Sequence, residues 1–148
     1  MRCRCCRRVL ILGLVWIAAA WGCRSAAPEE KEVAAGHQNL RFISAAYFRA
    51  TIKLDRPPRS LEELRPFLKE QTDSADVLRS PNDGENYVIL WGVDVRKPPA
   101  EGKGTPIWAY EQRGKDGKRY VLRGKNVAQL TDEEFQRADF PRGHKPVP

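Results

Sequence analysis

Cysteine and histidine are scarce in this sequence, and their positions exclude several kinds of site. All four cysteines lie within the first 23 positions, and the only histidines among the 148 residues are His37 and His144. Because no cysteine follows Cys23, we expect no internal disulfide in the folded part of the chain, which packing must then stabilise. The three cysteines before Cys23 have no neighbouring His or Cys pair that could complete a zinc site. The sequence therefore predicts neither a metal nor a cofactor.

Acidic residues are absent from the first 28 positions, whereas arginine is frequent there. The chain has 26 basic and 19 acidic residues, a net charge of +7. Four of the basic residues precede Cys23, and without them 22 basic residues face 19 acidic ones, a net charge of +3. They are Arg2, Arg4, Arg7 and Arg8. A basic surface that is removed with a signal cannot hold phosphate backbones, so we expect no nucleic-acid partner.

Residues 1–22 have the three parts of an export signal. Residues 1–8 are positively charged, and an apolar run of 12 residues follows from Val9 to Ala20. That run is shorter than the roughly 20 apolar residues of a membrane-spanning helix. The pair Gly22-Cys23 resembles the end of the lipobox of bacterial lipoproteins. The resemblance implies that Cys23 is acylated and becomes the first residue of the mature chain.

Two other fates of the signal stay open from the residues alone. An ordinary signal peptidase could cleave near Ala18–Ala20, or the run could remain as an uncleaved anchor that extends through Trp21. If Cys23 is acylated, each buried CH₂ group of its acyl chains contributes about 0.8 kcal/mol to membrane binding. Residues 23–32 would then be a polar tether. We predict an exported protein of the cell envelope, anchored in the membrane by lipid.

The chain after the tether begins with helical patterns. Leu40, Ile43 and Tyr47 recur at helical spacing within residues 29–52. The segment 56–59 (RPPR) ends that helix, because proline lacks an N–H and restricts the residue before it. Ser60 and Glu63 have the spacing of a capping box, which predicts a second short helix. Pro66 predicts a kink or a break within it.

Strand patterns follow the helices. Residues 86–95 have a period of two, with one fully apolar face and a second face that becomes polar toward its end, which predicts a long strand. Residues 107–111 and 119–123 flank Asp116-Gly117, a hairpin signal. A fourth strand over 127–130 and a capping box from Thr131 to Glu134 come next. The order predicts an α+β fold, in which a long N-terminal helix and a short helix precede a three- to four-stranded antiparallel sheet. We assign one domain to residues 33–140 and a tail to 141–148.

This order resembles the periplasmic part of type II secretion pseudopilins and related prepilin-like proteins. The similar segments are 58–64 (PRSLEEL), 80–84 (SPNDG), 107–111 (IWAYE), 119–122 (RYVL) and 133–135 (EEF). The resemblance implies a pseudopilin-like head. Because the apolar run ends at Cys23 and does not continue into the long helix, it implies a head on a lipid anchor rather than a filament subunit.

No constellation of residues predicts catalysis. A nucleophile–histidine–acid site needs a well-placed base, and neither His37 nor His144 has partners nearby in sequence. Asp83, Asp94 and Glu111 could form a two-carboxylate site only if the fold brought them together. We therefore expect a protein that is not an enzyme, with an interaction or structural role and an envelope protein as partner.

Aromatic residues of the predicted strands give an alternative function. If Trp108, Tyr110 and Tyr120 lie on an open sheet face, they could bind a glycan or a peptide. The other interpretation is that such rings pack beneath the long helix. We expect Trp91 to be in the core, and the sequence leaves Trp108 undecided.

Overall fold

Helices come first in the fold and an antiparallel sheet follows, as the α+β prediction requires. The computed structural model describes residues 28–98, 101 and 104–146. The predicted signal, Cys23 and the start of the tether lie outside these residues. The elements are α1 (Pro28–Lys53), α2 (Leu61–Lys69), β1 (Val88–Ile89), β2 (Ile107–Tyr110), β3 (Lys118–Arg123), β4 (Asn126–Thr131) and α3 (Asp132–Gln136).

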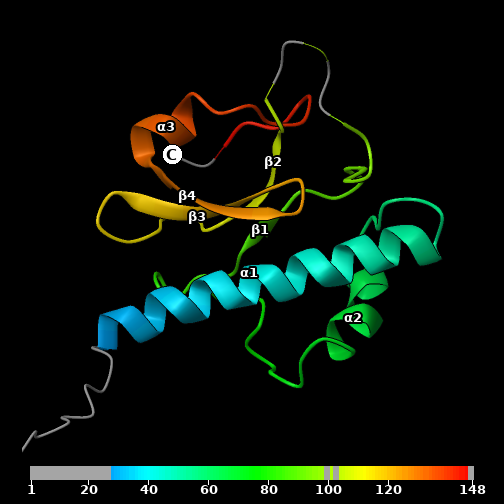
Figure 1. Ribbon diagram of the computed structural model, residues 1–148, viewed down its shortest axis with the longest axis horizontal. Coiled ribbons are helices and arrows are strands. Elements are labelled where there is room, and N and C mark those ends of the chain that lie inside the picture. The colour runs from blue at the N-terminus through cyan, green and yellow to red at the C-terminus, as the bar shows by residue number, and fades with distance from the viewer. Residues whose placement is uncertain (1–27, 99–100, 102–103, 147–148) are drawn as a thin grey trace, which may run out of the picture.

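α1 lies across one face of the sheet, and α2 packs beside its C-terminal half (Figure 1). The predicted apolar positions Leu40, Ile43 and Tyr47 are fully buried between these layers. α1 begins at Pro28, inside the range predicted as tether. Proline suits a first helical position because its missing N–H would have no helical partner there.

The predicted capping box at Ser60 is wrong. The Ser60 side chain makes no capping hydrogen bond to the backbone of α2. Glu63 instead accepts two 2.9 Å hydrogen bonds from the Arg56 guanidinium and a 3.0 Å bond from the Arg59 N–H. The carboxylate thus joins the start of α2 to the proline turn before it. Pro66 lies inside one continuous helix of nine residues.

The long strand predicted over residues 86–95 is also wrong, because the strand is limited to Val88–Ile89. Gly92 adopts a left-handed conformation with φ of +80°, and its N–H donates to the Pro58 carbonyl at 3.0 Å. The chain therefore leaves the sheet and binds the helix connection. Trp91 is 36% exposed rather than in the core, and its ring stacks on Tyr47 with the centroids 6.4 Å apart.

The four strands form an antiparallel sheet in the order β1-β2-β3-β4. Asp116 and Gly117 both have positive φ, 53° and 69°, as the predicted hairpin turn between β2 and β3 requires. The capping box of Thr131 and Glu134 is confirmed at the start of α3. Phe135 of α3 then covers the sheet face opposite α1.

Candidate functional site

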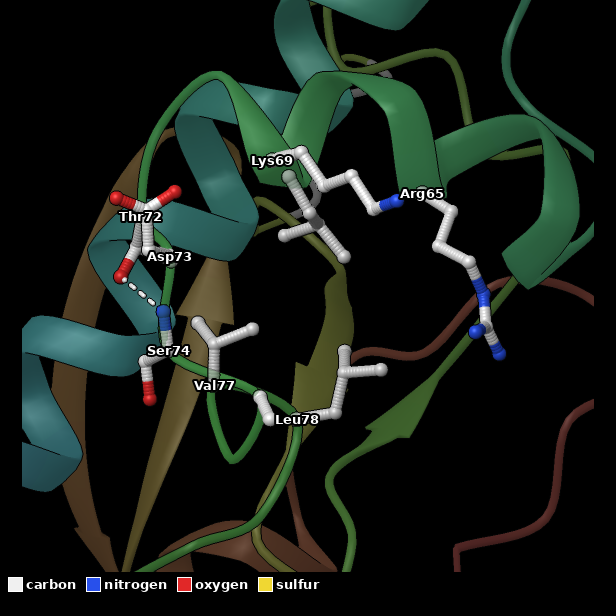
Figure 2. Close-up of a pocket in the computed structure, with 9 residues that line it drawn as sticks. Arg65, Lys69, Thr72, Asp73, Ser74, Val77 and Leu78 are labelled. Carbon is white, nitrogen blue, oxygen red and sulfur yellow. Dashed lines mark hydrogen bonds between the residues drawn. The ribbon is translucent and has the colours of Figure 1, made fainter.

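A hollow lies between α2 and the loop that follows it, with a volume of about 450 Å³. Its helix side is formed by Arg65, Leu68 and Lys69, and its loop side by residues 72–75, Val77 and Leu78. Figure 2 shows Val77 and Leu78 pointing from the loop toward α2. The hollow is large enough to accept side chains of another molecule.

A second hollow of about 180 Å³ continues from the first along α2. Leu78 lines both hollows, and Leu61 and Trp91 line the second one. Leu61, Arg65, Leu68 and Lys69 follow one another at helical spacing, so a single face of α2 forms one side of both. We call the two hollows together the α2 groove.

The α2 groove has an apolar floor and a basic rim. Leu68 and Val77 are buried at the bottom of the larger hollow, and Leu78 is half-buried. Arg65 and Lys69 are exposed on the helix side, whereas the loop side carries the Asp73 carboxylate. The charged groups that line the larger hollow are therefore two cations and one anion. The residues that line the smaller hollow carry no charge.

The outer edge of β1 opens on the smaller hollow at Ile89. The Leu90 N–H donates to the Trp108 carbonyl at 2.7 Å. The backbone N–H and C=O groups of residues 88 and 90 therefore point toward β2, and those of Ile89 point away from it. Tyr87 also faces the outer edge, where its N–H donates to the Leu78 carbonyl at 2.9 Å. The loop at Leu78 therefore pairs with the first part of this edge. The edge extends beyond the loop at Ile89.

The buried carboxylate of Glu111 fixes the loop wall of the groove. Its Oε1 accepts hydrogen bonds from the Ser80 hydroxyl at 2.7 Å and from Asn82 Nδ2 at 2.8 Å. Its Oε2 accepts a 2.7 Å bond from the Tyr120 N–H. Ser80 follows Leu78 by two residues, so the end of β2 holds the wall in place.

The electrostatics of this carboxylate are unusual for an acid at a strand end. Burial raises the pKa of Glu111, the nearby charge of Asp83 raises it further, and the three hydrogen bonds oppose the rise. Asn82 Oδ1 is buried beside it without a hydrogen-bond partner.

α1 approaches closely at Gly36, where an added Cβ would lie 3.2 Å from Asn82 Nδ2. The Tyr87 hydroxyl donates to the Gly36 carbonyl at 3.1 Å.

The rings that the alternative function needs on an open sheet face are buried, which corrects their assignment as binding residues. Trp108 is 1% exposed, and Tyr110 and Tyr120 are also buried. Trp108 packs against Tyr47 of α1 and donates its indole N–H to the Gly124 carbonyl at 2.7 Å. Helices on both sides of the sheet cover these rings, so they present no surface to a glycan.

The predicted acids and histidines have separate roles. Asp83 accepts hydrogen bonds from the N–H groups of Arg113 and Gly114, and Asp94 binds the Arg96 guanidinium. His144 contacts the Tyr110 hydroxyl at 3.0 Å, so the predicted tail packs on the domain. His37 packs edge-on against Tyr120. No group of three His, Cys, Asp or Glu side chains in the described residues could hold a metal ion.

Sequence reasoning missed the α2 groove and the network around Glu111. Neither feature has a sequence motif. The groove depends on the distance between α2 and the loop that follows it. One signal was present for the network. Gly36 lies inside a helix, where glycine is unfavourable, and such a glycine often marks a close approach.

No family model, curated protein or solved structure matches this chain. Within the described part of the chain, no helix combines the length and hydropathy that a membrane crossing needs.

Proposed function

We propose that this protein is a lipid-anchored component of the cell envelope whose folded domain binds another envelope protein without catalysing a reaction. The observation that carries the proposal is the position of Cys23. It follows Gly22, shortly after the apolar run of 12 residues that ends at Ala20, and precedes the first helix, which begins at Pro28. An acyl group there would hold the domain at a membrane surface.

The folded domain supports a binding role through the α2 groove. The groove combines an apolar floor with charged groups at its rim, which is the usual composition of a surface that recognises another molecule. The described residues that line it include no histidine or cysteine. Recognition is the chemistry that these side chains support.

In its specific form, the proposal makes the partner a component of a secretion or pilus-like assembly. This form rests on the resemblance to type II secretion pseudopilins, in which a long helix, a proline turn and a short helix precede a small sheet. A lipid anchor would hold such a head beside an assembly rather than inside its filament.

The experiment is chemical crosslinking in native envelopes, followed by identification of the crosslinked proteins. A Cys23→Ala variant expressed at the same level is the matched control, because it keeps the domain and removes the acylation site. We expect the native protein to crosslink to envelope proteins and the variant to lose these products. If the native protein yields no envelope protein, the interaction role is contradicted. If it yields envelope proteins but no secretion or pilus component, only the specific form fails.

A further inference from the structure

The α2 groove has two features that together define the chemistry of an occupant. Arg65 and Lys69 project from one face of α2 beside the larger hollow. The outward edge of β1 at Ile89 borders the smaller hollow. The two cations can bind a negative charge, and the strand edge can pair with an extended backbone.

The cationic feature lies on the helix side alone. Arg65 and Lys69 are exposed and one turn apart, so both can reach one acidic group above Leu68. The Ser60 side chain lowers the pKa of Glu62 through a hydrogen bond, and the nearby charge of Arg65 lowers it further. The Asp73 carboxylate stands on the opposite side of the hollow. An acidic group of an occupant would therefore bind toward the helix and away from the loop.

The backbone feature is a short length of strand edge with which no other strand of the described residues pairs. Residues 78–79 pair with residues 86–87 along the outer side of β1, through the Tyr87 N–H bond to Leu78 and the bridge between Arg79 and Asn86. The loop then turns away toward α2, and Ile89 continues the edge without it. An extended segment beside Ile89 would lie between Leu78 and Trp91, with an aliphatic side chain in the smaller hollow.

We propose that the α2 groove binds an extended, acidic segment of the partner protein, which pairs with the β1 edge at Ile89 and places a carboxylate against Arg65 and Lys69. The inference rests on the proposed function and names the chemistry of the partner. Charge complementarity selects an acidic segment, and the apolar floor at Leu68, Val77 and Leu78 selects an aliphatic residue beside it. The edge of β1 beside the smaller hollow favours an extended segment over a helix.

The test places a photoreactive amino acid at Asn86 in the full-length protein expressed in its native envelope. Asn86 is exposed and lines the smaller hollow. The same probe at Gln129, which is exposed on β4 at the opposite edge of the sheet, is the matched control. The crosslinked peptide is then identified by mass spectrometry. We expect the probe at position 86 to capture an acidic segment of another protein that contains aliphatic residues.

The charge requirement is tested in the same cells by the double variant Arg65→Glu and Lys69→Glu. We expect it to lower the yield of the crosslink at position 86 by about tenfold or more, because it places like charges opposite each other. The double variant Lys118→Glu and Arg137→Glu makes the same change in net charge on exposed residues of β3 and the α3 end, and should leave the yield unchanged. The milder pair Arg65→Gln and Lys69→Gln should lower it to an intermediate level, which guards against a folding defect in the reversed variant.

Several results would overturn the inference. They are a crosslink to a second copy of this chain, to lipid or to a basic segment, and a yield that charge reversal does not change. If position 129 captures an envelope protein and position 86 does not, the groove is not the binding surface, although the proposed function stands. If neither position captures an envelope protein, the inference fails, and the crosslinking experiment with the Cys23→Ala control decides separately whether the proposed function stands.

Discussion

The hydroxyl of Ser80 donates a 2.7 Å hydrogen bond to the buried carboxylate of Glu111. This contact joins two segments that are 31 residues apart in the chain. Ser80 ends the loop that forms one wall of the α2 groove, and Glu111 directly follows β2, an inner strand of the sheet. The shape of the groove therefore depends on a buried acid that does not line it.

Replacing Glu111 by Gln should be tolerated far better than replacing it by Ala. The new amide oxygen can accept the Tyr120 N–H, and the amide nitrogen can donate to Ser80. If the Asn82 side-chain amide rotated by a half-turn, its Oδ1, which has no partner in the native protein, could accept a hydrogen bond from the new amide nitrogen at position 111. We expect E111Q to change the free energy of unfolding by less than about 1 kcal/mol. E111A should lower it by about 2–4 kcal/mol, because it leaves a cavity and unpaired donors. Urea unfolding measures both, and equal losses would contradict the proposed exchange of hydrogen bonds.

The raised pKa of Glu111 predicts how stability depends on pH. The folded state holds the proton of this carboxyl more tightly than the unfolded state does, so it binds more protons at pH values just above the ordinary glutamate range. The contribution of Glu111 is therefore fully present below the unfolded pKa and is lost as pH rises through the folded pKa. Urea unfolding of the native protein and of E111Q between pH 4 and 8 isolates this effect. We expect the difference in stability, native minus E111Q, to decrease as pH rises. A difference that stays constant or increases would contradict the raised pKa.

The two tryptophans of the folded domain should differ strongly in their effect on stability, although the pattern of residues 86–95 predicts Trp91 in the core. Trp108 is 1% exposed and Trp91 is 36% exposed. We expect Trp108→Ala to lower the free energy of unfolding by about 3–5 kcal/mol, because a buried ring and its hydrogen bond are lost. Trp91→Ala should lower it by less than about 1.5 kcal/mol. Denaturant unfolding compares the two, and similar losses would place Trp91 in the core after all.

Thr131 and Ser60 both precede a helix with capping-box spacing, but only Thr131 caps one. Its hydroxyl accepts the Glu134 N–H at 3.2 Å, and Glu134 accepts the Thr131 N–H at 2.8 Å. We expect Thr131→Ala to lower the free energy of unfolding by about 1 kcal/mol. Ser60→Ala should have less than half of that effect, since Ser60 makes no capping bond to the backbone. Thermal unfolding of the two variants makes the comparison, and a larger loss for Ser60→Ala would refute it.

Arg119 should not tolerate replacement by Lys, although both side chains are cationic. It is buried, donates to Asp132 at 2.8 Å and to the Gln112 carbonyl at 2.9 Å, and its guanidinium lies 4.2 Å from the Phe135 ring centroid. A lysine ammonium cannot reproduce this planar arrangement, so we expect a loss of about 1–3 kcal/mol.

The matched control for this substitution is Arg113→Lys. Arg113 is exposed, and its pair with Glu85 is long at 3.9 Å, so the change in stability should be near zero. Urea unfolding of both variants decides the matter. A loss for Arg119→Lys no larger than that of the control would show that charge alone stabilises α3.

Local patterns predicted the parts of the fold that depend on neighbouring residues. The Asp116-Gly117 turn and the Thr131 cap need only the residues beside them, and both are present. The strand over residues 86–95 failed because its alternation continues past Gly92, where contacts with Pro58 and Tyr47 draw the chain away from the sheet. The burial of Trp108 and the position of the α2 groove depend on how helices and sheet stack. Such contacts join residues far apart in sequence, and no local pattern records them.

The most direct test of the account is metabolic labelling of the full-length protein with a radioactive fatty acid. The native protein should incorporate the label and be processed before Cys23. A Cys23→Ala variant should carry no label and remain as the unprocessed precursor. If the variant keeps the label, or if the native protein takes up none, the chain is not anchored through Cys23 and the central claim is contradicted.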